Sequence, residues 1–166
     1  MSDIPDDSPS IDVAKFRQVL GHFPSGVTVI TAMTAEGPVG LAIGSFASLS
    51  LEPPQVLFCP ARSSSSWPRI RDAGAFCVNI LADDQEDISR VFASKGTDKF
   101  SEIGWRRSGN GSPLLDGVLA YIDCEVGAVL DGGDHEIVIG KVQDLEVKHE
   151  GGPLVFFRGG YGRVTF

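Results

Sequence analysis

Residues 120–142 read AYIDCEVGAVLDGGDHEIVIGKV, and this stretch decides the fold class. Apolar residues occupy every second position from 120 to 128, which is typical of a β-strand with one solvated face. The residues expected on that solvated face are Tyr121, Asp123 and Glu125. Residues 131–134 form a hairpin turn signal, and the apolar run Ile137–Val142 returns as a second strand. The stretch therefore predicts a long antiparallel β-hairpin.

Further strands are expected on both sides of this hairpin. The β-branched run Val27–Thr31 and the run Val39–Ile43 form a second hairpin around Glu36-Gly37-Pro38. Three more apolar runs are Val56–Cys59, Phe76–Leu81 and Leu154–Phe157. At least seven strands in hairpin order favour a closed antiparallel barrel.

Only two or three helices are expected, at the periphery. From Asp12, apolar residues at helical spacing predict an amphipathic helix that ends before Pro24. A short helix follows Trp67 and ends at Gly74. A third runs from Asp84 to about Ser94, with Asp83 as its N-cap. The chain is therefore predicted to be mainly β, with a disordered tail over residues 1–11 and one domain over residues 12–166.

Composition excludes several classes of protein. The chain has 166 residues and a formal net charge of -8, which disfavours binding to nucleic acid. No apolar run approaches the ~18 residues of a membrane span, and the acidic start does not resemble a signal peptide. The three cysteines form no C-x-x-C pair, so we expect reduced core thiols and a cytoplasmic location.

Catalytic and metal-binding motifs are absent. The chain has no G-x-G-x-x-G after a strand, no Walker A loop and no G-x-S-x-G elbow, so a Rossmann fold is not expected. His135 stands between Asp134 and Glu136, but strand alternation sends both neighbours to the face opposite that of His135. We therefore predict no metal site.

Two serine-rich segments are the candidate binding region. In residues 44–54, GSFASLSLEPP, small hydroxyls beside main-chain amides suit a flat polar heterocycle. Alternatively, these serines only satisfy their own main chain. In residues 59–68, CPARSSSSWP, four serines precede a helix start and favour an anion such as phosphate; helix capping and a flexible linker are the alternatives.

Two later segments carry further candidate ligands. Residues 95–100, KGTDKF, bring two cations and an aromatic ring past a helix end, where they can contact phosphate or a stacked adenine. The alternative is that these lysines are surface residues that complement the helix dipole. His135, at the hairpin tip, and Tyr161, after the last strand, are candidates for holding a second, mobile ligand.

With these segments in order, the chain resembles the short-chain flavin reductases, the NAD(P)H-dependent partners of two-component aromatic monooxygenases, which fold as FMN-binding split barrels. The resemblance covers about residues 16–161. The motifs that carry it are FPSGVTVIT at 23–31, SFASLSLEPP at 45–54, FCVNIL at 76–81, DKF at 98–100 and GGDH at 132–135. Cys59-Pro60, Ser66-Trp67 and residues 121–124 are similar to the reductases of secosteroid and phenol-type hydroxylases.

The resemblance implies roles for individual residues. Those implied to line the isoalloxazine ring are Ser45, Phe46, Ser48, Ser50 and Leu51. Those implied to meet the ribityl and phosphate are Ala61, Ser64 and Ser66, with Lys95 and Phe100 near the distal end of the flavin. His135, as the catalytic residue, and Tyr161 are implied to approach the nicotinamide.

The expected activity is hydride transfer from NADH or NADPH to FAD or FMN. The resemblance also implies a homodimer that completes each flavin site and an oxygenase that receives the reduced flavin by diffusion. Two alternatives stay open. One is a split barrel that keeps its flavin tightly bound and reduces another acceptor, and the other is a non-catalytic carrier of flavin or haem.

Overall fold

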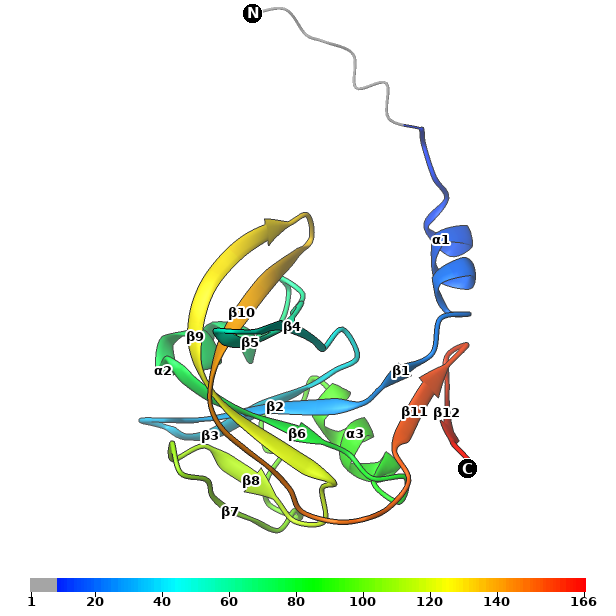
Figure 1. Ribbon diagram of the computed structural model, residues 1–166. Coiled ribbons are helices and arrows are strands. Elements are labelled where there is room, and N and C mark those ends of the chain that lie inside the picture. Colours follow the sequence, from blue (N-terminus) through cyan, green and yellow to red (C-terminus); the bar gives the residue numbers. More distant parts are fainter. Residues whose placement is uncertain (1–8) are drawn as a thin grey trace, which may run out of the picture.

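A seven-stranded antiparallel sheet forms the centre of the computed structural model, which describes residues 9–166 (Figure 1). The strands of this sheet are β2 (Thr28–Thr34), β3 (Gly37–Ile43), β4 (Ala47–Leu51), β5 (Pro54–Phe58), β6 (Ala75–Ile80), β9 (Ala120–Gly132) and β10 (His135–Val147). Their order across the sheet is β3-β2-β6-β9-β10-β5-β4. Most of the predicted tail lies outside the described residues.

Two small sheets and three helices complete the part of the chain that the structure describes. One sheet joins β1 (Ser25–Gly26), β11 (Leu154–Phe157) and β12 (Gly160–Arg163), and the other pairs β7 (Trp105–Arg107) with β8 (Pro113–Leu115). The helices are α1 (Val13–Leu20), α2 (Trp67–Ala73) and α3 (Glu86–Ala93). The prediction of a mainly β fold with peripheral helices is confirmed.

The predicted long hairpin is present as β9 and β10, which pair from Ala120 with Val147 to Gly132 with His135. The prediction of a solvated face is wrong at Tyr121 and Asp123, which are both buried. A loop covers that face, and the main-chain amide of Asn110 donates to Asp123 Oδ2 at 3.1 Å. Only Glu125 of the three is exposed.

The two edge strands of the sheet do not pair with each other, so the fold is the split barrel that the resemblance implies and not the fully closed barrel that hairpin order alone favours. β3 and β4 follow each other in the chain but form the two opposite edges of the sheet. The connection Gly44–Phe46 leads from one edge to the other without strand pairing. The barrel is therefore split at this connection, which contains the start of the first serine-rich segment.

Two apolar clusters cover the two faces of the sheet. The first contains Phe58, Phe76 and Trp67 of α2, whose rings meet edge to face through Phe58. The second contains Val29, Leu115 and Phe92 of α3. Because successive strand residues point to opposite faces, Val29 and Ile30 enter different clusters.

The three helices differ in how they pack. α1 begins as predicted after Asp12, whose side chain accepts from the amide of Ala14 at 2.9 Å, yet this helix buries none of its residues. α2 ends at Gly74 in the left-handed conformation, with φ of 78°. α3 begins at Glu86 rather than Asp84, and Asp83 is not its cap. The Gln85 side chain instead accepts from the amide of Ala82 and fixes the turn before the helix.

The cysteines follow the predicted burial at two of three positions. Cys77 and Cys124 are fully buried, whereas Cys59 is half-buried. Burial raises the pKa of the Cys124 thiol to about 12. Within residues 9–166, no cluster of three or more His, Cys, Asp or Glu side chains could hold a metal ion. The described helices include none with the length and apolar character of a membrane span.

Candidate functional site

A cavity of about 460 Å³ lies at the split in the barrel. Ser45 and Phe46, both predicted ring contacts, line it together with residues 23–28, Gly44, Ala47 and Ile80. Residues 23–28 belong to a motif that carries the family resemblance, but no contact with a ligand was predicted for them. They reach the cavity because Thr28 pairs with Ile43 across β2 and β3, which places the start of β2 beside the split.

The other three predicted ring contacts lie on the edge strand β4. Ser48 is exposed, Ser50 is half-buried and the Leu51 side chain is 96% exposed. The pairing of β4 with β5 shifts register between Ser48 and Ser50, so simple alternation does not hold there. Ser48, Ser50 and Leu51 therefore follow Ala47 of the cavity wall in the sequence but do not line the cavity themselves.

The second serine-rich segment begins α2. Ser64 Oγ accepts hydrogen bonds from the main-chain amides of Ser66 and Trp67, each at 3.2 Å. The capping alternative is thus realised at Ser64, and these two amides already have a partner. Ser66 is buried, with 9% of its surface exposed.

A second cavity, of about 200 Å³, brings Ser66 and Phe100 together. Arg69 and Lys99 supply two cationic side chains to its wall, and Ser65 and Thr97 also line it. Lys99 Nζ donates to the carbonyl of Phe92 at 3.1 Å, and burial lowers the pKa of this amine. Lys99 is one of the two candidate cations of residues 95–100, although the resemblance assigned a role only to Lys95, and Arg69 was not among the predicted site residues.

Lys95, which was predicted to lie near the distal end of the flavin, is exposed and does not line this cavity, although the adjacent Gly96 does. The signal that could have favoured Lys99 over Lys95 is its place beside Phe100 within the DKF motif at residues 98–100. The predicted role of Lys95 stays a prediction.

The tip of the β9–β10 hairpin carries His135 to the second serine-rich segment. Ala61 and His135 form an isolated antiparallel bridge, and the amide of Glu136 donates to the carbonyl of Pro60 at 3.0 Å. The His135 ring contacts the Asp134 carboxylate at 2.8 Å, and this hydrogen bond lowers the pKa of Asp134. Two predicted site residues, Ala61 and His135, are therefore neighbours.

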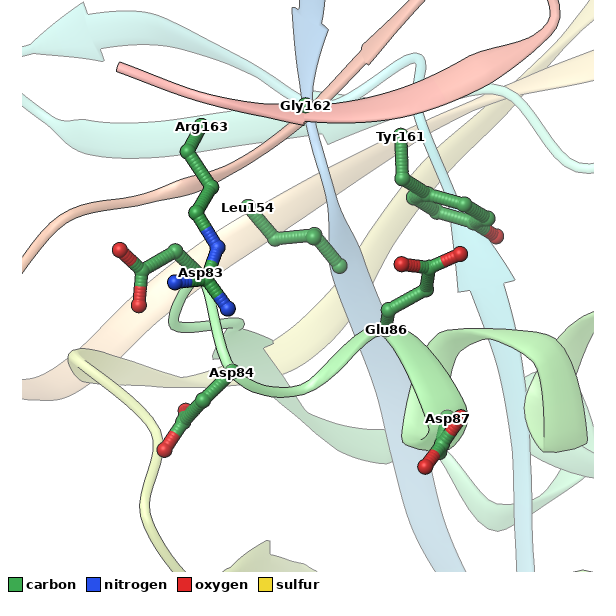
Figure 2. Close-up of a pocket in the computed structure, with 8 residues that line it drawn as sticks. All are labelled: Asp83, Asp84, Glu86, Asp87, Leu154, Tyr161, Gly162 and Arg163. Atoms are coloured by element: carbon green, nitrogen blue, oxygen red, sulfur yellow. The ribbon is translucent and has the colours of Figure 1, made fainter. Parts of the chain in front are cut away.

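Tyr161 lies in different surroundings, in a pocket of about 280 Å³ between β12 and the start of α3 (Figure 2). Figure 2 shows Tyr161 and Arg163 on one strand, across from the carboxylates of Asp83, Asp84, Glu86 and Asp87. The Tyr161 hydroxyl shares a hydrogen bond of 2.8 Å with Ser89. Within the described chain Tyr161 does not meet His135, and its nicotinamide role stays a prediction.

Contacts join most of the remaining predicted site residues into one region. The Ser45 hydroxyl bonds the main chain of Cys59, two residues before Ala61. The amide of Ser64 donates to the carbonyl of Ala61, and Ser66 then opens onto the cavity of Phe100. The region therefore runs from the cavity at the split, past the hairpin tip, to the second cavity, which we call the cationic cavity because Arg69 and Lys99 line it.

The chain is similar in sequence to known flavin reductases. A flavin reductase from Pseudomonas putida is 53% identical over 154 residues, which cover 92% of this chain and 91% of that protein. The reductase subunit HsaB of a flavin-dependent monooxygenase from Mycobacterium tuberculosis is 53% identical over 158 residues, covering 93% of this chain and 83% of that protein.

Solved structures agree with these relatives. Nitrilotriacetate monooxygenase component B from Mycobacterium thermoresistibile superposes with a TM-score of 0.89 at 51% identity, covering 92% of this chain and 86% of that one. The NADH:FAD oxidoreductase SgcE6 of Streptomyces globisporus, solved with NAD and FAD fragments, has a TM-score of 0.88 at 33% identity and 93% coverage of each chain.

The family model for the flavin reductase like domain matches residues 20–165, a range that contains every predicted site residue. The predicted family and the predicted split-barrel class are confirmed by this match and by the solved structures. The chain belongs to the flavin reductase-like family.

Proposed function

We propose that this protein is an NAD(P)H-dependent flavin reductase that reduces FAD or FMN and supplies the reduced flavin to a partner monooxygenase. The observation that carries the proposal is the family match over residues 20–165, which includes both cavities and the hairpin tip. Relatives at 53% identity are named as a flavin reductase and as the reductase subunit of a monooxygenase.

The residues of the two cavities fit a flavin. The cavity at the split has aromatic walls in Phe23 and Phe46 beside main chain and small polar residues, which suits a flat, partly apolar ring. The smaller cavity offers the cations Arg69 and Lys99, which suit phosphate and stand out in a chain of net charge -8. We infer that the ring binds at the split and the phosphates toward Arg69.

His135 is the side chain proposed to contact the nicotinamide. It lies on the exposed hairpin tip, and its side chain is 46% exposed. A mobile second substrate needs such an accessible contact beside the bound flavin.

When stacked, the two cofactors supply the chemistry themselves, by passing a hydride from nicotinamide C4 to flavin N5. The chain then has to hold the two rings at about 3 to 3.5 Å in the right orientation and to exclude water from the contact. This requirement needs no triad and no paired carboxylates, and the described residues that line the cavity at the split and the cavity of Arg69 and Lys99 include neither.

We also propose that the protein is a homodimer. The apolar residues of α1 and the one just before it are more than half exposed, namely Ile11, Val13, Phe16, Val19 and Leu20. Figure 1 shows that α1 stands apart from the main sheet. Apolar side chains in such a row are costly in water and suit burial against a second copy. Three free cysteines support the proposal of a reducing, cytoplasmic compartment.

An NADH-oxidation assay tests the activity. The purified protein is mixed with FAD or FMN and with NADH or NADPH, and the loss of absorbance at the reduced nicotinamide band is followed with an oxygen-consumption control. We expect multiple turnovers with at least one flavin. A yellow protein that gives a single burst would support a tightly bound flavin, and no rate above the uncatalysed background would contradict the proposal.

A further inference from the structure

The side chain of Arg62 donates three hydrogen bonds to the β9–β10 hairpin. Its Nε donates to the carbonyl of Gly133 at 2.8 Å, Nη1 donates to Glu136 Oε1 at 3.0 Å, and Nη2 donates to Asp131 Oδ1 at 2.6 Å. The main-chain amide of Arg62 adds a bond to the carbonyl of Asp134 at 2.9 Å. One residue of the serine-rich segment therefore holds both strands of the hairpin tip and the turn between them.

Glu136 links the same tip to the core. While Oε1 faces Arg62, Oε2 accepts from the indole Nε1 of Trp67 at 2.6 Å. The Glu136 side chain is only 16% exposed and its charge is paired with that of Arg62, whose side chain is 44% exposed, while its bond to Trp67 is part-buried. Trp67 is itself fixed, because its ring packs on Phe58 and its amide donates to Ser64.

The hairpin tip has few other supports. The neighbouring strand β5 pairs with β10 only from Val138 to Lys141, so the tip projects beyond that edge. Residues 128–135 are exposed. The contacts of residues 60–62 and Trp67 are thus the anchors that the described chain provides for the tip.

Because side chains alternate along a strand, anchoring Glu136 also sets the direction of the His135 side chain. His135 and Glu136 are adjacent in β10, so their side chains point to opposite faces of the hairpin. Fixing Glu136 toward Arg62 and Trp67 commits His135 to the outward face. The same network holds Ser64, so the hairpin tip and the start of α2 form one body.

We propose that Arg62 and Glu136 are positioning residues, which set His135 relative to the flavin-phosphate side of the site and thereby orient the nicotinamide for hydride transfer. This inference rests on the proposed function. It assigns the two residues an effect on the nicotinamide substrate that acts through His135, in addition to their contribution to the fold.

The test compares Glu136→Gln with Glu146→Gln, which makes the same chemical change on the same strand, in an exposed ion pair with Lys148. We expect Glu136→Gln to raise the KM for NADH about tenfold, as the loss of one charge-assisted hydrogen bond would, while the KM for flavin changes less than about twofold. Glu146→Gln should change neither constant. Arg62→Lys, which keeps the charge but not the three guanidinium hydrogen bonds, should resemble Glu136→Gln.

A double-mutant cycle separates positioning from a general loss of structure. In a His135→Ala background, Glu136→Gln should add less than about twofold to the KM for NADH. Equal effects of Glu136→Gln in both backgrounds would overturn the inference. If the wild-type protein oxidises no NADH, the proposed function fails first. Hydrogen exchange then still tests the anchor, since the amides of residues 131–136 should exchange faster in Glu136→Gln than in Glu146→Gln.

Discussion

The hydroxyl of Ser45 bonds both main-chain groups of Cys59, accepting from its amide at 3.0 Å and donating to its carbonyl at 3.2 Å. These two residues lie 14 positions apart, on either side of β4 and β5. The bonds tie the split in the barrel to the segment that leads into the second serine run. The Ser45 hydroxyl is thus committed to the protein, and we expect a ligand in the cavity to meet the main chain of Ser45 and its neighbour Phe46.

Ser45→Ala should therefore affect stability more than flavin binding. Removing the hydroxyl leaves two main-chain groups of Cys59 without their partner, which should lower the free energy of unfolding by about 1 kcal/mol. Urea unfolding measures this loss, and flavin fluorescence quenching measures affinity, which should change less than about threefold. Ser63→Ala is the matched control, because Ser63 makes no side-chain hydrogen bond within residues 9–166. Weaker flavin binding with unchanged stability would contradict this reading of Ser45.

Local signals in the sequence explain which parts of the fold could be predicted. The alternation over residues 120–142 depends only on strand geometry, and the β9–β10 hairpin follows it. Asp12 and Gly74 are cap residues whose chemistry acts within one turn, and both mark helix ends in the structure. Such features need no knowledge of the rest of the chain.

Features that depend on distant segments escaped prediction. Asp123 has the pattern of a solvated position, but the loop with Asn110 covers it, and nothing in the strand records that loop. Lys99 lines the cavity of Arg69 and Phe100, whereas Lys95 does not. This difference could not be predicted, because an irregular segment has no periodicity from which the direction of its side chains can be inferred. Arg62 and Glu136 are 74 positions apart, and only the folded hairpin brings them together.

Tyr121 should give stability a specific dependence on alkaline pH. Its hydroxyl donates to Asp144 at 2.8 Å, and this bond, with burial, raises the pKa of Tyr121 from its ordinary value of 10 to about 12. Between these values the unfolded chain releases the tyrosine proton before the folded chain does, so the folded state loses relative stability as pH rises. The contribution of this hydroxyl is complete below pH 10 and disappears by about pH 12.

Tyr121→Phe measures that contribution. At pH 8 the variant should lose about 1 kcal/mol of unfolding free energy, the value of a typical hydrogen bond. The difference between wild type and variant should shrink as the urea midpoints are measured at pH values above 10. Curves that stay parallel over that range would show that the bond to Asp144 does not control the titration.

Phe16→Asp should dissociate the proposed homodimer. Phe16 is 56% exposed on α1, with Val13 and Leu20 on the same side of the helix, and a carboxylate there cannot be buried against a second copy without a large desolvation cost. We expect the dissociation constant to rise about 100-fold or more, measured by light scattering after gel filtration. Gln18→Asp adds the same charge on the opposite face of α1 and should leave the dimer intact. A wild-type protein that is monomeric at all concentrations would contradict the homodimer.

His135→Ala should change the use of NADH without changing the fold. Within residues 9–166 the ring makes its one side-chain hydrogen bond with the Asp134 carboxylate, and it is 46% exposed, so its removal should alter the free energy of unfolding by less than about 0.5 kcal/mol. Because the ring lies on the outward face of the hairpin tip, beside Ala61 and the second serine run, its loss should raise the KM for NADH about tenfold while the KM for flavin stays within about twofold. Asp134→Asn, which removes the carboxylate that holds the ring, should give a smaller effect in the same direction. Steady-state kinetics with each substrate varied in turn measures both constants, and an unchanged KM for NADH in His135→Ala would favour a protein that binds flavin without a nicotinamide contact at this hairpin.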